Sequence, residues 1–242
     1  MLLSRSVVAL AAVSAVAAVL AGFGTRAGWW HFRTGFQALT WAAYGGLGAA
    51  ILGSAALLSA RWTRQRRATM LTVVGILIGL VVVGIPWQMK RTAQRVPAIH
   101  DISTDTDDPP RFDAVLPLRK DAPNAADYGG PEIAAQQHAA YPDVRPLLWR
   151  MPSSQAFTQA LHAAEAMGWE IVAADPIEGR LEATDTTFWF GFKDDIVVRI
   201  QGQPDGSRVD VRSVSRVGRS DVGTNARRIR EYLRRLEAGI GS

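Results

Sequence analysis

Three apolar runs without a charged side chain open the sequence. They cover residues 7–24 (VVALAAVSAVAAVLAGFG), 36–59 and 68–88. A helix needs about 20 apolar residues to cross roughly 30 Å of hydrocarbon, and the second and third runs clearly meet this requirement. The pattern therefore predicts a transmembrane region over residues 1–96, with helices near 7–24, 36–59 and 68–88.

The first run allows a second interpretation. It is the shortest and most alanine-rich of the three, and it follows MLLSRS, so a cleaved signal peptide is an alternative. We favour a retained span, because two further runs follow and no A-x-A site ends the first. Within the second and third runs, Gly45, Ala49 and Gly53, and again Gly75 and Gly79, recur at every fourth position. Small residues at this spacing let helices approach closely, within one chain or in a homo-oligomer.

The arginines between the runs predict an orientation. The segment RWTRQRR at 61–67 holds four arginines, whereas the connection between the first two runs holds only Arg26 and Arg33. Cytoplasmic loops are enriched in Lys and Arg, so we expect the N-terminus and 61–67 inside, and the chain after residue 90 outside. Three basic residues just after the third run oppose this choice. The expected location is the cell inner membrane of a bacterium, with several spans and with the polar domain in the periplasm or otherwise outside the cytoplasm.

The rest of the chain has the alternating patterns of a soluble α+β domain, residues 97–242. Residues 97–130 are rich in Pro, Asp and Thr, which indicates an extended lead-in. Helices are expected at 131–141, 153–168 and 221–239, and strands at 169–175, 180–192, 195–201 and 207–215. Residues 145–149 are expected to form a brief strand or an extended piece. We predict an antiparallel sheet with two main helices packed on one face.

Three local signals refine this pattern. Ser153 or Ser154 is placed to cap the helix over 153–168. Val222, Ala226, Ile229, Leu233 and Leu236 follow the helical period of the last helix. The aromatic cluster Phe188, Trp189, Phe190 and Phe192 is expected on a strand, in the core or on a sheet face, with a ligand groove as the alternative.

Charge is divided between the two halves. All 22 Asp and Glu lie between Asp101 and Glu237, and ten of the 27 Lys and Arg precede residue 97. The first part therefore carries about +10, and the remaining 17 basic residues against 22 acids leave −5. A mildly acidic polar domain argues against a nucleic-acid partner. The absence of cysteine excludes disulfides, thiolate zinc sites and a cysteine nucleophile.

The segment SRVGRSDVGTN, residues 215–225, stands between the last predicted strand and the last helix. Asp221 or Ser220 can cap that helix, and arginines beside a helix N-terminus attract phosphate, carboxylate or a lipid head group. Alternatively, Arg212 and Arg216 pair with Asp101, Asp105 or Asp221 and lock the strand-to-helix corner. The candidate ligand-binding residues are His100, Asp101, Thr104, Asp105, Arg212, Ser213, Ser215, Arg216, Ser220, Asp221 and Asn225.

Other chemistries find weaker support. HDISTDTDD at 100–108 begins like a calcium loop, but Thr106 and Phe112 stand where an EF-hand requires Gly and Glu. The loop is expected to bond its own backbone, with a looser divalent-cation site as the alternative. His100 with a serine of the motif suggests a Ser-His-Asp hydrolase, but no G-x-S-x-G elbow occurs. Walker, dinucleotide, H-E-x-x-H and zinc patterns are also absent. No catalytic residue, cofactor or metal ligand is assigned.

Two stretches carry a family resemblance: IHDISTDTDDPPRF at 99–112 and VRSVSRVGRSDVGTNARRI at 211–229, supported by residues 183–200. They resemble the domain of unknown function numbered 1499, over roughly residues 97–238, in a membrane-attached subgroup with three spans. The resemblance implies an uncharacterised bacterial and plastid domain with no assigned activity. Many members carry an Asn-Cys pair near the domain start, where this sequence has HDISTDTDDPP, so no role of that cysteine is transferred.

The leading hypothesis is a non-enzymatic envelope protein, in which three spans hold an α+β domain on the outer side of the cytoplasmic membrane. Its expected partners are the lipid bilayer and a small anionic ligand or an envelope protein. The alternative is an enzyme that acts on an anionic envelope substrate through His100, Asp101 and the Arg/Ser motif.

Overall fold

The structure, a computed structural model, describes residues 2–59 and 66–239. Most of the arginine-rich segment 61–67, with Arg61 and Arg64, lies outside the described residues. The chain divides into two compact units. One comprises Met1–Thr92 together with Phe188–Gly191, and the other comprises Ala93–Thr187 and Phe192–Ser242.

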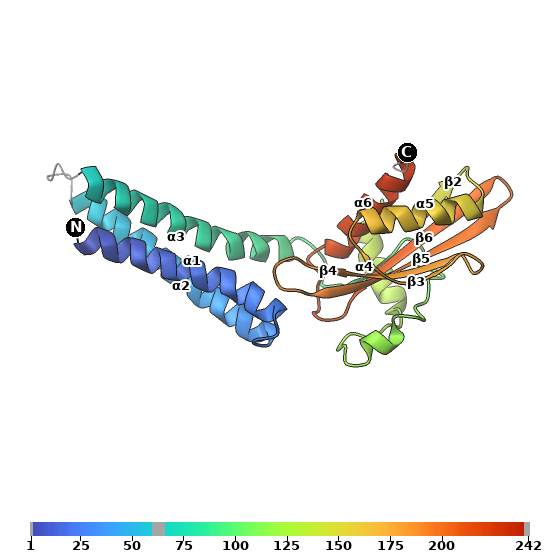
Figure 1. The fold of residues 1–242 in the computed structure, drawn as a ribbon, viewed down its shortest axis with the longest axis horizontal. Coiled ribbons are helices and arrows are strands. Elements are labelled where there is room, and N and C mark those ends of the chain that lie inside the picture. Colours follow the sequence, from blue (N-terminus) through green and yellow to red (C-terminus); the bar gives the residue numbers. More distant parts are fainter. Residues whose placement is uncertain (1, 60–65, 240–242) are drawn as a thin grey trace. The chain divides into compact units, whose positions relative to one another are not determined.

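The first unit contains the predicted long helices (Figure 1). They are α1 (Leu2–Arg26), α2 (Phe32–Ser59) and α3 (Arg66–Ala93), and all three are long and apolar enough to cross a membrane. The prediction of three N-terminal apolar helices is thus confirmed. Each helix is longer than its apolar run, because the flanking polar residues continue the same backbone hydrogen bonding.

The small residues of the spans lie where these helices meet one another. A methyl group added at Gly79 of α3 would overlap the carbonyl of Gly46 in α2, and one added at Gly45 would overlap Ser14 of α1. A methyl group at Gly75 would likewise overlap Val7 of α1, and one at Gly53 of α2 would overlap Ile76 of α3. The small faces are therefore used in packing within one chain, as expected where helix association depends on close contact and not on exclusion of water.

The second unit is built on an antiparallel sheet, and it confirms the predicted α+β class (Figure 1). The strand order is β1-β6-β5-β4-β3, and β2 also pairs with β6. The strands are β1 (Asp101–Ser103), β2 (Leu147–Trp149), β3 (Glu170–Asp175), β4 (Arg180–Thr186), β5 (Lys193–Gln203) and β6 (Gly206–Ser215). The remaining elements are the 3-10 helix η2 (Leu116–Arg119), α4 (Gly130–Ala140), α5 (Ser153–Ala166) and α6 (Thr224–Glu237).

One face of the sheet is apolar and is covered by α5 and α6 (Figure 1). Strand alternation sends Ile196, Val198, Val209 and Val211 to this face. They pack against the alanine-rich side of α5 and against Ala226, Ile229 and Leu236 of α6. The buried hydroxyl of Tyr232 in α6 donates to the carbonyl of Ala160 in α5 at 2.8 Å, so the two helices are joined as well as packed.

The opposite face is polar and is covered by the segment that precedes α4. Phe112 and Val115 from this segment form a small core with Val197 and Val214 of the sheet. The segment expected as an extended lead-in is largely without regular structure, but it contributes β1 and η2 to the domain. Its few apolar residues do not follow the period of a helix or a strand, but Phe112 and Val115 pack the segment onto the sheet.

Three expectations about element ends are wrong. The N-cap of α5 is Pro152, and neither Ser153 nor Ser154 caps it by a side-chain hydrogen bond. The last helix begins at Thr224, so Val222 precedes it, with a left-handed φ of 55°. The aromatic cluster is not borne by a strand, because β4 ends at Thr186 and the backbone N–H of Thr187 donates to the carbonyl of Phe192, which closes a loop.

Candidate functional site

The two stretches that contain the candidate residues lie side by side. β1 and β6 are antiparallel, with Asp101 opposite Val214 and Ser103 opposite Arg212. Beyond the strand end, the backbone N–H of Asp221 donates to the carbonyl of Ile99 at 3.1 Å. Sequence reasoning therefore selected residues that form one region, although they are more than 100 positions apart.

Arg212 and Asp101 form a buried bidentate ion pair. Nε of Arg212 donates to Oδ1 of Asp101 at 2.9 Å, and Nη2 donates to Oδ2 at 2.7 Å. The guanidinium also donates to the carbonyls of Pro110 and Ala126, and it lies over the rings of Phe112 and Tyr128. The predicted pairing of Arg212 with Asp101 is confirmed. Burial, together with the charge of Asp101, raises the pKa of Tyr128 to about 12.

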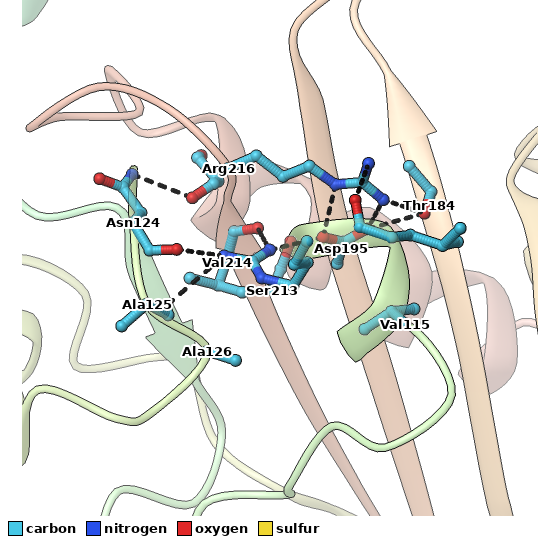
Figure 2. Close-up of polar contacts among 12 residues, drawn as sticks. Val115, Asn124, Ala125, Ala126, Thr184, Asp195, Ser213, Val214 and Arg216 are labelled. Carbon is cyan, nitrogen blue, oxygen red and sulfur yellow. Dashed lines mark hydrogen bonds and ion pairs between the residues drawn. The ribbon is translucent and has the colours of Figure 1, made fainter. Parts of the chain in front are cut away.

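Arg216 reaches a different carboxylate, Asp195 of β5 (Figure 2). Nε of Arg216 donates to Oδ2 of Asp195 at 2.9 Å and Nη2 donates to Oδ1 at 2.8 Å. Nη1 of Arg119, from η2, donates to the same carboxylate at 2.5 Å, and the Thr184 hydroxyl donates at 2.7 Å. Burial alone raises the pKa of Asp195, but the donors from Arg216, Thr184 and Arg119 outweigh it and hold the pKa below its usual value.

The expectation that Arg216 pairs with Asp101, Asp105 or Asp221 is therefore wrong. Arg216 follows the last residue of β6, and its backbone N–H donates to the carbonyl of Lys193, the first residue of β5. This places its side chain over β5 and β4, whereas Asp101 lies on the opposite neighbour of β6. The strand order decides the partner, and sequence spacing does not reveal that order.

Asp105 and Thr104 form hydrogen bonds to residues of β5 and β6, and Asp105 also bonds the backbone of its own loop. Oδ2 of Asp105 accepts from Arg208 at 2.7 Å and from Arg199 at 3.1 Å. Its Oδ1 accepts from the backbone N–H groups of Asp107 and Asp108, which is the local backbone bonding expected of this loop. The backbone N–H of Val211 donates to the hydroxyl of Thr104 at 2.8 Å.

Ser213, Ser215 and Asn225 form a polar cluster between β6 and α6. The Ser213 hydroxyl donates to Oδ1 of Asn225 at 2.8 Å, and Nδ2 of Asn225 donates to the Ser215 hydroxyl at 3.1 Å. Nδ2 also donates to the backbone carbonyl of His100 at 2.9 Å. The cluster is completed by Arg228, which donates to Ser213 and Asn225 and also binds Asp194 and Asp185.

Asp221 and Ser220 organise the start of α6. The backbone N–H groups of Gly223 and Asn225 donate to the Asp221 carboxylate at 2.8 and 2.7 Å, and the N–H of Val222 donates to the Ser220 hydroxyl at 3.1 Å. Asp221 stands two residues before the N-cap, Gly223, whose φ is 73°. The expectation that Asp221 or Ser220 is the N-cap is therefore wrong, because the left-handed residues Val222 and Gly223 delay the helix start to Thr224. The Asp221 carboxylate still accepts from the N–H group of Asn225, which the helix itself leaves free. Burial raises the pKa of Asp221, although both backbone donors favour its charged form.

Sequence reasoning missed several members of this network, namely Arg119, Thr184, Asp194, Asp195 and Arg228. All five are buried. Asp195 had one detectable signal, because it stands within a strand where the alternation places it on the same face as Val197. Arg228 had none, because an arginine on a strongly basic helix is expected to face water.

A cavity of about 240 Å³ lies beside this network, between the loop 108–111 and strands β4 and β5. Arg111, Arg180 and Arg199 line it, together with Asp108 and Glu178. Arg180 and Arg199 already form ion pairs with several carboxylates, Glu178 and Asp108 among them. The cavity therefore has no dominant charge to favour an anion, and none of the candidate ligand-binding residues lines it.

These features define a class: a protein with three helices that can span a membrane and an α+β domain stabilised by an internal arginine–carboxylate network. The family described as Protein of unknown function (DUF1499) matches residues 101–236. The match covers more than half of the chain, and the chain belongs to this family. No curated protein is similar enough to the chain to count as a match.

Proposed function

We propose that this protein is a non-enzymatic component of the bacterial cell envelope, whose α+β domain is a scaffold or binding module on the outer side of the cytoplasmic membrane. One observation carries the proposal: the arginines and carboxylates of the family motif neutralise one another inside the fold. Arg212 binds Asp101, Arg216 binds Asp195 and Arg228 binds Asp194. Arginines and carboxylates that are paired inside the fold hold the domain together and are not free to bind a ligand. Contacts with the bilayer or with an envelope protein are therefore made by other residues on the surface of the domain.

The acid–base character of the network supports a scaffold over an enzyme. A general base works best with a pKa near the operating pH, and the lowered pKa of Asp195 makes its carboxylate a poor proton acceptor. The Ser213 hydroxyl donates to the amide oxygen of Asn225, and an amide does not remove a proton from a nucleophile. The described partners of the Ser213 hydroxyl are thus an amide and the guanidinium of Arg228, and neither is the base that an activated serine requires.

The outer location is supported by the four arginines at 61–67. Reporter fusions placed after Pro97 test it directly. Alkaline phosphatase fused there is expected to be active, and green fluorescent protein fused there is expected to be dark. Bright fluorescence with an inactive phosphatase would place the domain in the cytoplasm instead.

The claim that the motif residues stabilise the fold, and do not bind an anion, is tested by thermal unfolding. The full chain is unfolded in detergent micelles, with inorganic phosphate added at constant ionic strength. A ligand present at about 100 times its Kd would add about 2.7 kcal/mol to stability. We expect no phosphate-dependent rise in the wild-type midpoint, and a lower midpoint for Arg216→Ala with or without phosphate.

Arg219→Ala is the matched control, because Arg219 is an exposed arginine of the same motif. Its midpoint is expected to equal that of the wild type. A rise with phosphate that disappears in Arg216→Ala would identify a ligand site and overturn the scaffold proposal.

A further inference from the structure

The loop between β4 and β5 is uncharged and aromatic. Residues 186–192 read TTFWFGF, and the first charged residue after them is Lys193. The Thr187 hydroxyl accepts from the backbone N–H of Phe192 at 2.8 Å, so the loop has a defined base. Phe188 at its tip is 78 % exposed. An exposed aromatic tip that is part of a larger apolar patch is a candidate contact with a membrane or another protein.

The tip, Phe188–Gly191, belongs to the unit that contains the three long helices. Nε1 of Trp189 donates to the carbonyl of Val19 in α1 at 3.2 Å, and Nη1 of Arg26 donates to the carbonyl of Phe188 at 2.7 Å. The Phe188 ring packs edge-on against Phe23, with 5.5 Å between the ring centroids. The tip therefore gathers at the C-terminal end of α1.

The start of α2 contributes to the same aromatic group. The centroids of Phe190 and Phe36 are 5.0 Å apart. The connection from α1 to α2 carries Trp29 and Trp30, which form an edge-on pair, and Trp29 is largely exposed. Aromatic residues with one apolar and one polar edge gather where a bilayer meets water. The end of the helix pair thus has the composition of a membrane interface, and the tip adds three aromatic residues to it.

Because there are three long helices, the α1–α2 connection and the domain that carries the tip are expected on the same side of the membrane. If α1, α2 and α3 all cross, the connection from α1 to α2 and the chain after α3 emerge on the same side, whichever way the N-terminus points. The tip of the β4–β5 loop therefore lies on the side where the Trp29–Trp30 connection meets the lipid head groups.

We propose that the loop 187–192 is an interfacial anchor, whose Phe188 and Trp189 insert into the boundary between lipid head groups and acyl chains beside the α1–α2 connection. The partner is the bilayer surface. Lys193, exposed directly after the loop, is placed to meet anionic head groups. The inference rests on the membrane anchoring proposed above, and it adds a second point of membrane attachment within the domain sequence.

The absence of cysteine allows a direct test in the full chain. Single-cysteine variants Phe188→Cys, Ile177→Cys and Leu47→Cys carry a fluorescent label in vesicles of phosphatidylcholine and phosphatidylglycerol. Quenching is measured with nitroxide-bearing lipids and with aqueous iodide. Ile177, 96 % exposed in the β3–β4 turn, is the control for water, and Leu47, on the outside of α2, is the control for lipid.

We expect lipid quenching at Phe188 to exceed that at Ile177 by roughly twofold or more, with less iodide quenching, as befits an interfacial position. If Leu47 is quenched by lipid and Phe188 matches Ile177, the anchor is wrong and the membrane spans stand. If Leu47 also resists lipid quenching, the membrane anchoring itself fails. A Phe188 label protected from both quenchers would mean that protein covers the loop, which also overturns the proposal.

Discussion

At the scale of single residues, the partner of each arginine follows from strand pairing. Arg212 and Val214 stand on the polar face of β6, opposite Ser103 and Asp101 of β1, so the Arg212 side chain meets Asp101. Arg216 comes after the strand, where the chain follows β5, and it meets Asp195. Arg212 and Arg216 are only four positions apart, yet they bind carboxylates on opposite neighbours of β6.

The Asp195 site predicts a large effect of Arg216→Ala on stability. Breaking a buried ion pair by removing one partner costs about 3–5 kcal/mol, and we expect about 3 kcal/mol because Arg119 still compensates Asp195. Arg230→Ala is the control, since its pair with Asp143 is exposed on both sides and should contribute no more than about 1 kcal/mol. Denaturant unfolding of the full chain in micelles measures both. Equal effects of the two substitutions would contradict the buried network.

The lowered pKa of Asp195 gives that effect a pH dependence. A carboxylate whose pKa is lower in the folded state contributes its full stability above the unfolded pKa of about 3.9, and loses it as the pH falls through the folded pKa. We expect the difference in unfolding free energy between wild type and Arg216→Ala to be constant from about pH 7 to 5, and to shrink below about pH 4. A difference that persists at the lowest pH at which both proteins fold would mean that packing of the Arg216 stem, and not the charge, is what the variant loses.

The raised pKa of Asp221 acts in the opposite direction. Burial makes its charged form unfavourable in the folded state, so protonation favours folding as the pH falls through the folded pKa. This gain lies at higher pH than the loss at Asp195, because a raised pKa lies above the unfolded value and a lowered one below it. Comparing single variants with the wild type separates the two contributions.

The ion-pair partner of an arginine could be predicted from the sequence where it depended on one strand pairing. It could not be predicted where it depended on the order of the strands in the sheet. Asp101 with Arg212 requires only that the two motifs are adjacent. Asp195 with Arg119, Thr184 and Arg216 requires η2, β4, β5 and the end of β6 to converge. Residues 76 positions apart, such as Arg119 and Asp195, have no local pattern that joins them.

At the scale of elements, the start of α6 is stabilised by a carboxylate outside the helix. Loss of an N-terminal cap costs about 1 kcal/mol, so Asp221→Ala is expected to lower the unfolding free energy by about that amount, and by less than Arg216→Ala. Ser154→Ala at the start of α5 is the matched control, because no side-chain cap operates there. Its expected effect is within about 0.5 kcal/mol. Chemical denaturation of the full chain compares the three variants, and a larger effect of Ser154→Ala than of Asp221→Ala would contradict the capping described.

Element type was easier to predict than element ends. The helical period of α6 was clear, but its first residue depends on Val222 and Gly223, both in left-handed backbone conformations that precede Thr224. The aromatic run after β4 has a high strand propensity, yet Gly191, with a φ of 68°, bends the chain into a loop. Propensity describes the conformation that a residue favours on average. At these positions the left-handed backbone of the turn residues decided where the element ended.

At the scale of the whole molecule, the polar region contains everything that its core requires. Both apolar clusters of the sheet consist of residues between Ile99 and Leu236. The arginine–carboxylate pairs of the sheet and of α6 likewise join side chains between Asp101 and Arg235. The spans, in contrast, pack through glycine and serine contacts that suit a lipid environment.

We therefore predict that residues 97–242 fold without the spans. The fragment keeps both apolar clusters and every carboxylate of the network, and an α+β domain of this size ordinarily unfolds in one cooperative transition. Calorimetry of the purified fragment measures that transition. Arg216→Ala within the fragment provides the internal check, because it must lower the midpoint if the transition reports the native network. A soluble fragment without a cooperative transition would show that the domain needs the membrane region to fold, and the network around Asp195 would then stabilise the structure only in the intact chain.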